Sequence, residues 1–166
     1  MIYFLIIFNF LFSFGVQSFS LPHSALELSN SNSGIANSNN ANINAANISN
    51  IKNSISFSSI SWYQGVKGSN INYKWGDNYH HNINVYNLTA SDIELRDIVP
   101  NDHPIGLFDI HHISLSYGFG TKINNNIKIG AKANFSYNQL YVDESNGYHM
   151  NFGLSYLYNQ FLSFGL

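Results

Sequence analysis

The chain has 166 residues, enough for one domain, and its formal net charge of -2 excludes the basic stripe that nucleic-acid binding requires. Cysteine is absent, so disulfide frameworks, thiolate metal sites and cysteine nucleophiles are excluded as well. Only 10% of the residues are charged and 16% are aromatic, yet the mean hydropathy is -0.10, a mixture typical of a β-barrel whose strands face acyl chains on one side and a polar lumen on the other.

Residues 1–20 read as a signal peptide. The apolar run over residues 1–14 is shorter than the ~20 residues that a membrane helix needs. Small residues follow at a spacing that signal peptidase accepts, and cleavage is expected after Ser18 or Ser20. No Lys or Arg precedes the run, so an uncleaved anchor is the alternative. After cleavage, no apolar stretch remains for a membrane helix, and membrane insertion would have to use strands.

Residues 21–50 form a compositionally distinct segment built almost wholly from Ser, Asn, Ala, Gly and Ile. Such small side chains either pack closely or stay unfolded. The composition leaves both outcomes open.

Residues 51–166 carry the alternation of apolar and polar side chains that predicts strands. The clearest case is residues 127–141, where Ile127 and Phe135 share one face and Lys128 and Lys132 share the other. This run exceeds the 5 or 6 residues of an ordinary strand and reaches the about 9 to 11 that a membrane strand needs. The same alternation over residues 113–119 and 150–156 predicts a meander, with connections at residues 121–126 and 142–147.

Shorter strands are predicted earlier in the chain, over residues 55–62, 70–75 and 82–88, with a bulge at Ser58 and Ser59 where the alternation breaks. The total is about six strands and the start of a seventh at Phe161. Aromatic residues gather near the strand ends, as in the interfacial girdles of outer-membrane barrels. The alternative is a soluble β-sandwich with tyrosines at its rim.

Two groups of residues carry side chains that could bind a metal or act in catalysis. His80, His81, Asp109, His111 and His112 offer imidazole and carboxylate ligands, but adjacent residues on a strand point to opposite faces, so we expect no metal site. The dense ionisable cluster of Asp92, Glu94, Arg96, Asp97, Asp102 and His103 reads as a solvated loop between strands rather than a pair of catalytic carboxylates. Nucleophile elbows, phosphate loops and dinucleotide fingerprints are absent, so we expect no enzymatic activity and no cofactor.

The order of these features resembles the N-terminal half of the PorV/PorQ family of outer-membrane proteins, which are distant relatives of FadL-type transporters. The resemblance covers Ser24 to Leu166. It includes a strand with the sequence Ser56–Phe57–Ser58 followed by Trp62, the acidic loop before Pro100, and the strand of Ile127–Lys128–Ile129–Gly130. The family-motif positions are Ala25, Leu26, Gly34, Ala36, Asn44 and Ala46. The family's motif has Pro where this chain has Ala45 and Gly where it has Asn47, so the rigid turn that Pro imposes is not guaranteed.

The resemblance implies an all-β fold, namely a partial antiparallel transmembrane β-barrel in the bacterial outer membrane. Residues 51–166 would form its N-terminal part, and residues 21–50 would be a plug in the lumen. Family barrels resemble a fourteen-stranded architecture of about twice this length, so we expect either a fragment or a chain that assembles with another half. An open sheet in lipid would leave unpaired edges.

The function implied is a non-enzymatic docking or shuttle component for protein export of a type IX-like kind, with outer-membrane lipid, secreted cargo proteins or other secretion components as partners. The loop of residues 88–108, with Asp92, Glu94, Arg96 and Asp97, would bind cargo. Lys128 and Lys132 would face the lumen, where they either contact a bound segment or stay solvated. A FadL-like transporter of hydrophobic molecules and a secreted, soluble β-rich adhesin or surface domain are the alternatives.

Overall fold

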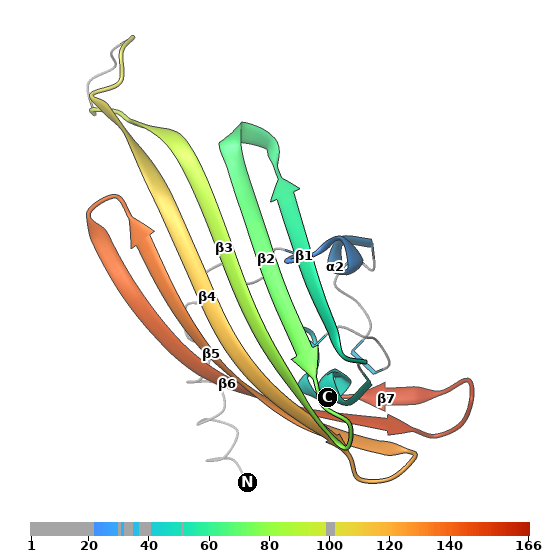
Figure 1. The fold of residues 1–166 in the computed structure, drawn as a ribbon. Helices are drawn as coiled ribbons and strands as arrows, with labels where there is room; N and C mark the ends of the chain where they lie inside the picture. The colour runs from blue at the N-terminus through green and yellow to red at the C-terminus, as the bar shows by residue number, and fades with distance from the viewer. Residues whose placement is uncertain (1–21, 30, 32–34, 37–40, 51, 99–101) are drawn as a thin grey trace, which may run out of the picture.

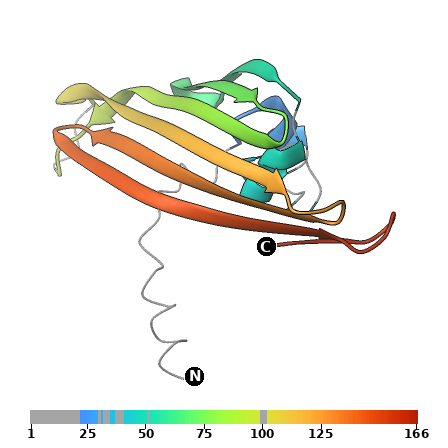
Figure 2. The same ribbon diagram turned by 60° about the horizontal axis from the view of Figure 1, so that its bottom comes forward.

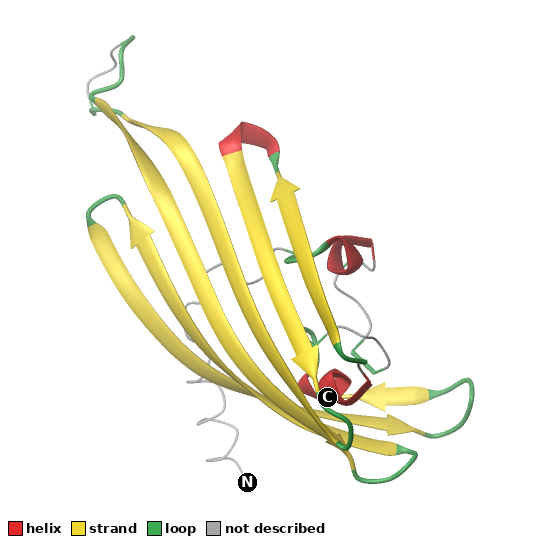
Figure 3. Cartoon of the chain, viewed as in Figure 1, coloured by secondary structure: helices red, strands yellow, loops and turns green. Residues whose placement is uncertain are grey.

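In the computed structural model, residues 22–29, 31, 35–36, 41–50, 52–98 and 102–166 are described. Their strands form one antiparallel sheet in the order β1-β2-β3-β4-β5-β6-β7, so each strand pairs with its neighbours in sequence (Figures 1 and 3). The strands are β1 (Ser54–Ser61), β2 (Val66–Trp75), β3 (Tyr79–Leu95), β4 (Gly106–Lys122), β5 (Ile127–Leu140), β6 (Asp143–Leu157) and β7 (Ser163–Gly165). The prediction of an all-β antiparallel meander is confirmed; the sheet is open, with β1 and β7 at its edges.

Within the described ranges, three short helical segments accompany the sheet: α2 (Ala25–Ser29), η2 (Ala45–Asn50) and η3 (Tyr63–Gly65). The sheet is curved, and α2 and η2 lie on its concave side (Figure 2). η2 contacts β3, β4, β5 and β6, whereas η3 connects β1 to β2 and contacts β3. We call the described residues between 22 and 50 the inner segment. In the described part of the chain, no helix has both the length and the apolar character that a bilayer crossing requires.

The sheet has an outer face and an inner face, set by period-two alternation and by register. Phe57 pairs with Ile71, which pairs with Val85, so these side chains form one row on the outer face. Leu115 and Phe135 continue the row across β4 and β5. Because a one-residue slip would turn every side chain to the opposite face, this register fixes which residues meet the inner segment.

Several local expectations were wrong. β1 pairs continuously with β2 from Ser54 to Ser61, without a bulge at Ser58 and Ser59. The alternation breaks there because Ile60 belongs to the inner face, opposite Gly68. The bulge lies instead in β3, between Ala90 and Ile93. Asp92 adopts a positive φ of 61° at this bulge.

The connections also differ from expectation. Asn146 and Gly147 lie inside β6 rather than in a turn, because the hairpin closes earlier, with Leu140 opposite Asp143. Tyr141, expected on the apolar face of the strand, lies in this two-residue turn with a φ of 57°. Fourteen paired residues along β5 and β6 outweigh the local turn preference of Asn-Gly. The turn expected at residues 121–126 is confirmed over residues 123–126, between β4 and β5.

The predicted loop of residues 88–108 is much shorter in the structure. Leu88 and Ala90 pair with His112 and Ile110, and strand pairing resumes beyond the bulge up to Leu95 opposite Gly106. β2 ends its pairing at Ala90 and β5 at Ile110, so the rest of the β3–β4 hairpin projects past both neighbours (Figure 1). We call residues 91–109 the projecting hairpin.

Candidate functional site

The outer face carries a continuous exposed apolar band. Phe152 and Met150 of β6 are 77% and 73% exposed, and their neighbours on β5, Ala131 and Ala133, are small and apolar. The band's exposed members also include Ile55, Phe57, Ile71, Tyr73, Ile83, Val85, Ile113, Leu115, Tyr117, Ile129 and Leu154. A surface of this extent is rare on soluble monomers, whose largest apolar patch is a few hundred Å².

The height of the band can be judged along β5. From Ile127 to Tyr137 the outward positions are apolar over ten residue steps, which is about 33 Å of strand. A strand tilted by ~40° then covers about 25 Å, the height of the apolar band in outer-membrane barrels. Beyond that level, the outward residues become polar, as at Thr89, His111 and Gln139.

Aromatic side chains gather at the opposite end of the band, near the 76–78 turn. Trp75 stacks between Tyr73 and His81, with ring centroids 5.0 and 5.2 Å apart. Nδ1 of His81 lies 2.8 Å from the hydroxyl oxygen of Tyr117. This row of rings with polar tips fits the boundary between an apolar and a wet environment.

The inner face is polar, and the inner segment covers part of it. Its buried polar residues are Asn70, Asn72, Asn82, Asn84, His112, Ser114, Ser116, Lys132, Ser136 and Ser155. Some bond along the sheet: Nδ2 of Asn84 donates to Oδ1 of Asn70 at 2.6 Å, and Nδ2 of Asn82 donates to Oδ1 of Asn72 at 2.9 Å. Cross-strand amide pairs of this kind satisfy groups that burial would otherwise leave without partners.

Glycines let η2 approach the inner face closely. A Cβ at Gly130 would lie 2.1 Å from the carbonyl oxygen of Ala45, and one at Gly153 would lie 2.0 Å from Oδ1 of Asn44. At Gly118 and Gly120 a Cβ would collide with Ile48, which is fully buried. Only glycine permits this contact, because any side chain would overlap the backbone of the inner segment.

Asn44 fixes η2 to the sheet. Its Nδ2 donates to the carbonyl oxygens of Ile35 (2.7 Å) and Leu154 (3.1 Å), while its Oδ1 accepts from the backbone N–H of Ala46 at 2.9 Å. The hydroxyl of Ser155 donates to the carbonyl oxygen of Ala36 at 2.5 Å. Asn44 therefore holds η2 in place through hydrogen bonds to Ile35 and to Leu154 of β6.

The family-motif residues fall into two groups. Ala36, Asn44 and Ala46 lie against the sheet, and Ala46 is fully buried. Ala25 and Leu26 lie in α2, where Ala25 is exposed, and Gly34 lies outside the described residues. The predicted signal peptide and Pro100 also lie outside them.

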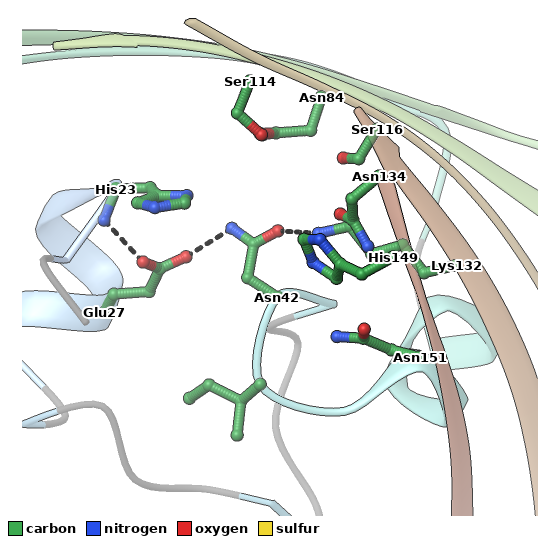
Figure 4. Close-up of a pocket in the computed structure, with 11 residues that line it drawn as sticks. His23, Glu27, Asn42, Asn84, Ser114, Ser116, Lys132, Asn134, His149 and Asn151 are labelled. Atoms are coloured by element: carbon green, nitrogen blue, oxygen red, sulfur yellow. Dashed lines mark hydrogen bonds between the residues drawn. The ribbon is translucent and has the colours of Figure 1, made fainter. Parts of the chain in front are cut away.

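A chain of hydrogen bonds joins α2 to the sheet above a polar cavity (Figure 4). Nζ of Lys132 donates to Oδ1 of Asn42 at 2.5 Å, and Nδ2 of Asn42 donates to Oε1 of Glu27 at 2.6 Å. The backbone N–H of His23 donates to Oε2 of Glu27 at 2.6 Å. A buried anion and a buried cation are thus neutralised through one amide.

The cavity beside this chain of hydrogen bonds has a volume of about 260 Å³. It is lined by His23, Glu27, Asn42, Ile43, Asn84, Ser114, Ser116, Lys132, Asn134, His149 and Asn151. The His23 ring stacks on Tyr86 with centroids 3.9 Å apart. Burial lowers the pKa of His23 from 6.5 to about 4, with Lys132 and His112 adding to the decrease and Glu27 opposing it.

The predicted lumen-facing residues both belong to the inner face, but only Lys132 joins this site. Lys132 is 7% exposed and contacts the inner segment, whereas Lys128 lies four residues away on the same face and does not line the cavity.

The sequence did not point to His23, Glu27 and Asn42 as members of this site. One signal was available, because Glu27 is the single acidic residue among the first 76 and follows Ser24 in a capping-box spacing.

The candidate loop residues lie together on the projecting hairpin. Nε of Arg96 donates to Oε2 of Glu94 at 2.7 Å, and both side chains are about half exposed. Asp92 donates its backbone N–H to Oδ1 of Asp109 at 3.1 Å, and Asp97 is exposed. Ile98 near the tip is 98% exposed. Among the described residues, no group of three or more His, Cys, Asp or Glu could hold a metal ion.

Comparison of the chain with protein-family models, curated proteins and solved structures finds no match.

Proposed function

We propose that this chain is part of a non-enzymatic outer-membrane β-barrel of PorV/PorQ type, which acts as a docking or shuttle component for exported proteins. The observation that carries the proposal is the outer apolar band, about 25 Å high on a sheet whose opposite face is polar. In this reading the band meets hydrocarbon, the inner face lines the lumen, and the inner segment acts as a plug.

The projecting hairpin supports the docking role. It extends past β2 and β5, carries most of the chain's acidic residues, and exposes Ile98, Ile105 and Leu107. Surface that combines charge with exposed apolar side chains, held by rigid strands, suits recognition of another protein. Cargo would bind there, while the strands hold the hairpin above the membrane.

The two alternatives fit the faces of the sheet less well. A FadL-like transporter of hydrophobic molecules would need an apolar path along the inner face, which is lined here by Asn, Ser, His and Lys. A soluble adhesin would bury its apolar stripes, whereas Phe152 and Met150 are mostly exposed.

The membrane claim is tested by folding the chain into preformed phospholipid vesicles. We expect a heat-modifiable band on electrophoresis and co-flotation of protein with lipid. A compact monomer that stays in buffer without detergent would overturn the proposal.

The docking claim needs a second experiment in the producing cell. A variant in which a short Gly-containing turn replaces residues 92–105 should still reach the outer membrane but should fail to retain secreted cargo. Unchanged cargo release by this variant, at equal membrane levels, would contradict docking through the hairpin.

A further inference from the structure

We infer that the cavity between the inner segment and the inner face is a binding site for a small, neutral polyhydroxylated molecule of monosaccharide size. This inference goes beyond the docking role, and it does not require the projecting hairpin.

The first observation is that several buried polar atoms facing the cavity have no hydrogen-bond partner among the residues that the structure describes. Oγ of Ser116 has no hydrogen bond although the residue is only 2% exposed. Nδ2 of Asn134 and both ring nitrogens of His23 are likewise buried without partners. These residues come from β4, β5 and the start of the inner segment, so their side chains face the cavity from different sides (Figure 4). Buried groups of this kind are normally satisfied, and a ligand would satisfy them.

The second observation concerns charge. The two lining charges, Glu27 and Lys132, are already connected through Asn42, so the cavity has no net charge to offer an ion. A bound carboxylate or phosphate would gain Lys132 but would approach Glu27. The ring of His23, neutral at pH 7, supplies one donor and one acceptor.

The third observation concerns polarity and size. Among the described residues that line the cavity, Ile43 is the only aliphatic one, so a hydrophobic ligand would leave several hydrogen-bonding groups without partners. The volume of about 260 Å³ lies below the ~300–1,000 Å³ of drug-sized sites. Hydroxyl groups, which both donate and accept, match the mixed lining of amide, hydroxyl and imidazole groups.

The test uses the full chain folded in a detergent that carries no sugar headgroup, with D-glucose as the probe and sodium acetate as the charged comparison. Saturation-transfer NMR should show glucose contact, with no comparable signal for acetate. Ser116→Val and Asn134→Leu should each weaken glucose binding by about fivefold or more, because each leaves a hydroxyl unmatched. Ser69→Val, which makes the same substitution on the outer face of β2, is the matched control and should bind as the parent does.

Three outcomes would overturn the inference: acetate binding without glucose binding, no signal from either probe, or equal glucose binding by the Ser116→Val and Ser69→Val variants. Retained heat-modifiable mobility shows that each variant is folded, so a lost signal reports on the cavity. Glucose binding tests the cavity, and vesicle insertion tests the proposed membrane location. Failure of one test therefore does not contradict the other claim.

Discussion

The two faces of this sheet reverse the arrangement of a soluble protein. The outer face exposes Phe152, Leu115 and Phe57, whereas the inner face buries Asn82, Asn84 and Ser116. In water, burying amides while exposing large apolar side chains is unfavourable, because the apolar surface stays hydrated and each buried amide needs a partner. The contrast is the arrangement that the proposed membrane location requires, with apolar side chains facing outward and polar side chains packed against the inner segment.

The strongest test of the contrast places one charge on each face at the same depth. Phe152→Lys should lower the free energy of unfolding in lipid by about 2–4 kcal/mol, because an ammonium would enter hydrocarbon. Asn151→Lys, one residue away on the inner face, should lower it less, by about 1 kcal/mol or less, because its ammonium would lie opposite Lys132 in a polar lining rather than in hydrocarbon. Denaturant titration in vesicles measures both; equal effects would break the assignment of the faces.

Lowering the pH should reduce the free energy of unfolding through His23, which lies between the inner segment and the inner face. Because burial lowers the pKa of His23 to about 4, the unfolded chain takes up a proton below pH 6.5 while the folded chain does not. The contribution of neutral His23 is therefore complete above pH 6.5 and is lost as pH falls toward 4, to an extent on the order of 3 kcal/mol. His23→Gln should flatten this part of the stability profile measured in vesicles. A parent profile that is level from pH 7 to 4 would contradict the burial of this ring.

A third prediction sharpens the role of the glycines. Gly130→Val should displace Ala45 and lower stability by about 1–3 kcal/mol, because a side chain has no room there. Hydrogen exchange of residues 45–50 should rise in this variant. Ala133→Val, on the outer face of the same strand, is the control and should leave that exchange unchanged. Protected η2 amides in the Gly130→Val protein would show that η2 is held elsewhere.

The smallest effect on stability is expected at the projecting hairpin. Glu94→Gln with Asp97→Asn should change the free energy of unfolding by less than about 0.5 kcal/mol, since the Arg96–Glu94 pair is exposed. The same double variant should reduce cargo retention if the hairpin docks exported proteins. Lys67→Gln, at an exposed site on β2, provides a charge-change control for retention.

Much of the sheet could be predicted from the sequence because alternation is a local signal. The strand at residues 127–140, the turn near residues 123–126 and the seven strands of the described sheet followed from side-chain periodicity. The errors arose where local signals conflicted with pairing. Asn146-Gly147 has the composition of a turn, yet its position opposite Tyr137 and Ser136 places it within a ladder. The break at Ser58 and Ser59 reflects a change of the face that is apolar, which composition cannot distinguish from a bulge.

The polar cavity could not be predicted in the same way. Glu27, Asn42 and Lys132 lie up to 105 positions apart, and no spacing rule connects them. Their meeting depends on where η2 sits against Gly130 and Gly153, which is a matter of shape rather than of pattern.

The sequence by itself determined the class of the fold and the alternation of apolar and polar faces, because both arise from the two-residue period of an extended chain. Tertiary structure alone decided the strand register, the projecting hairpin and the placement of the inner segment over the polar face. Those features depend on backbone pairing and on close packing between distant residues, and neither is encoded in any short stretch of the chain.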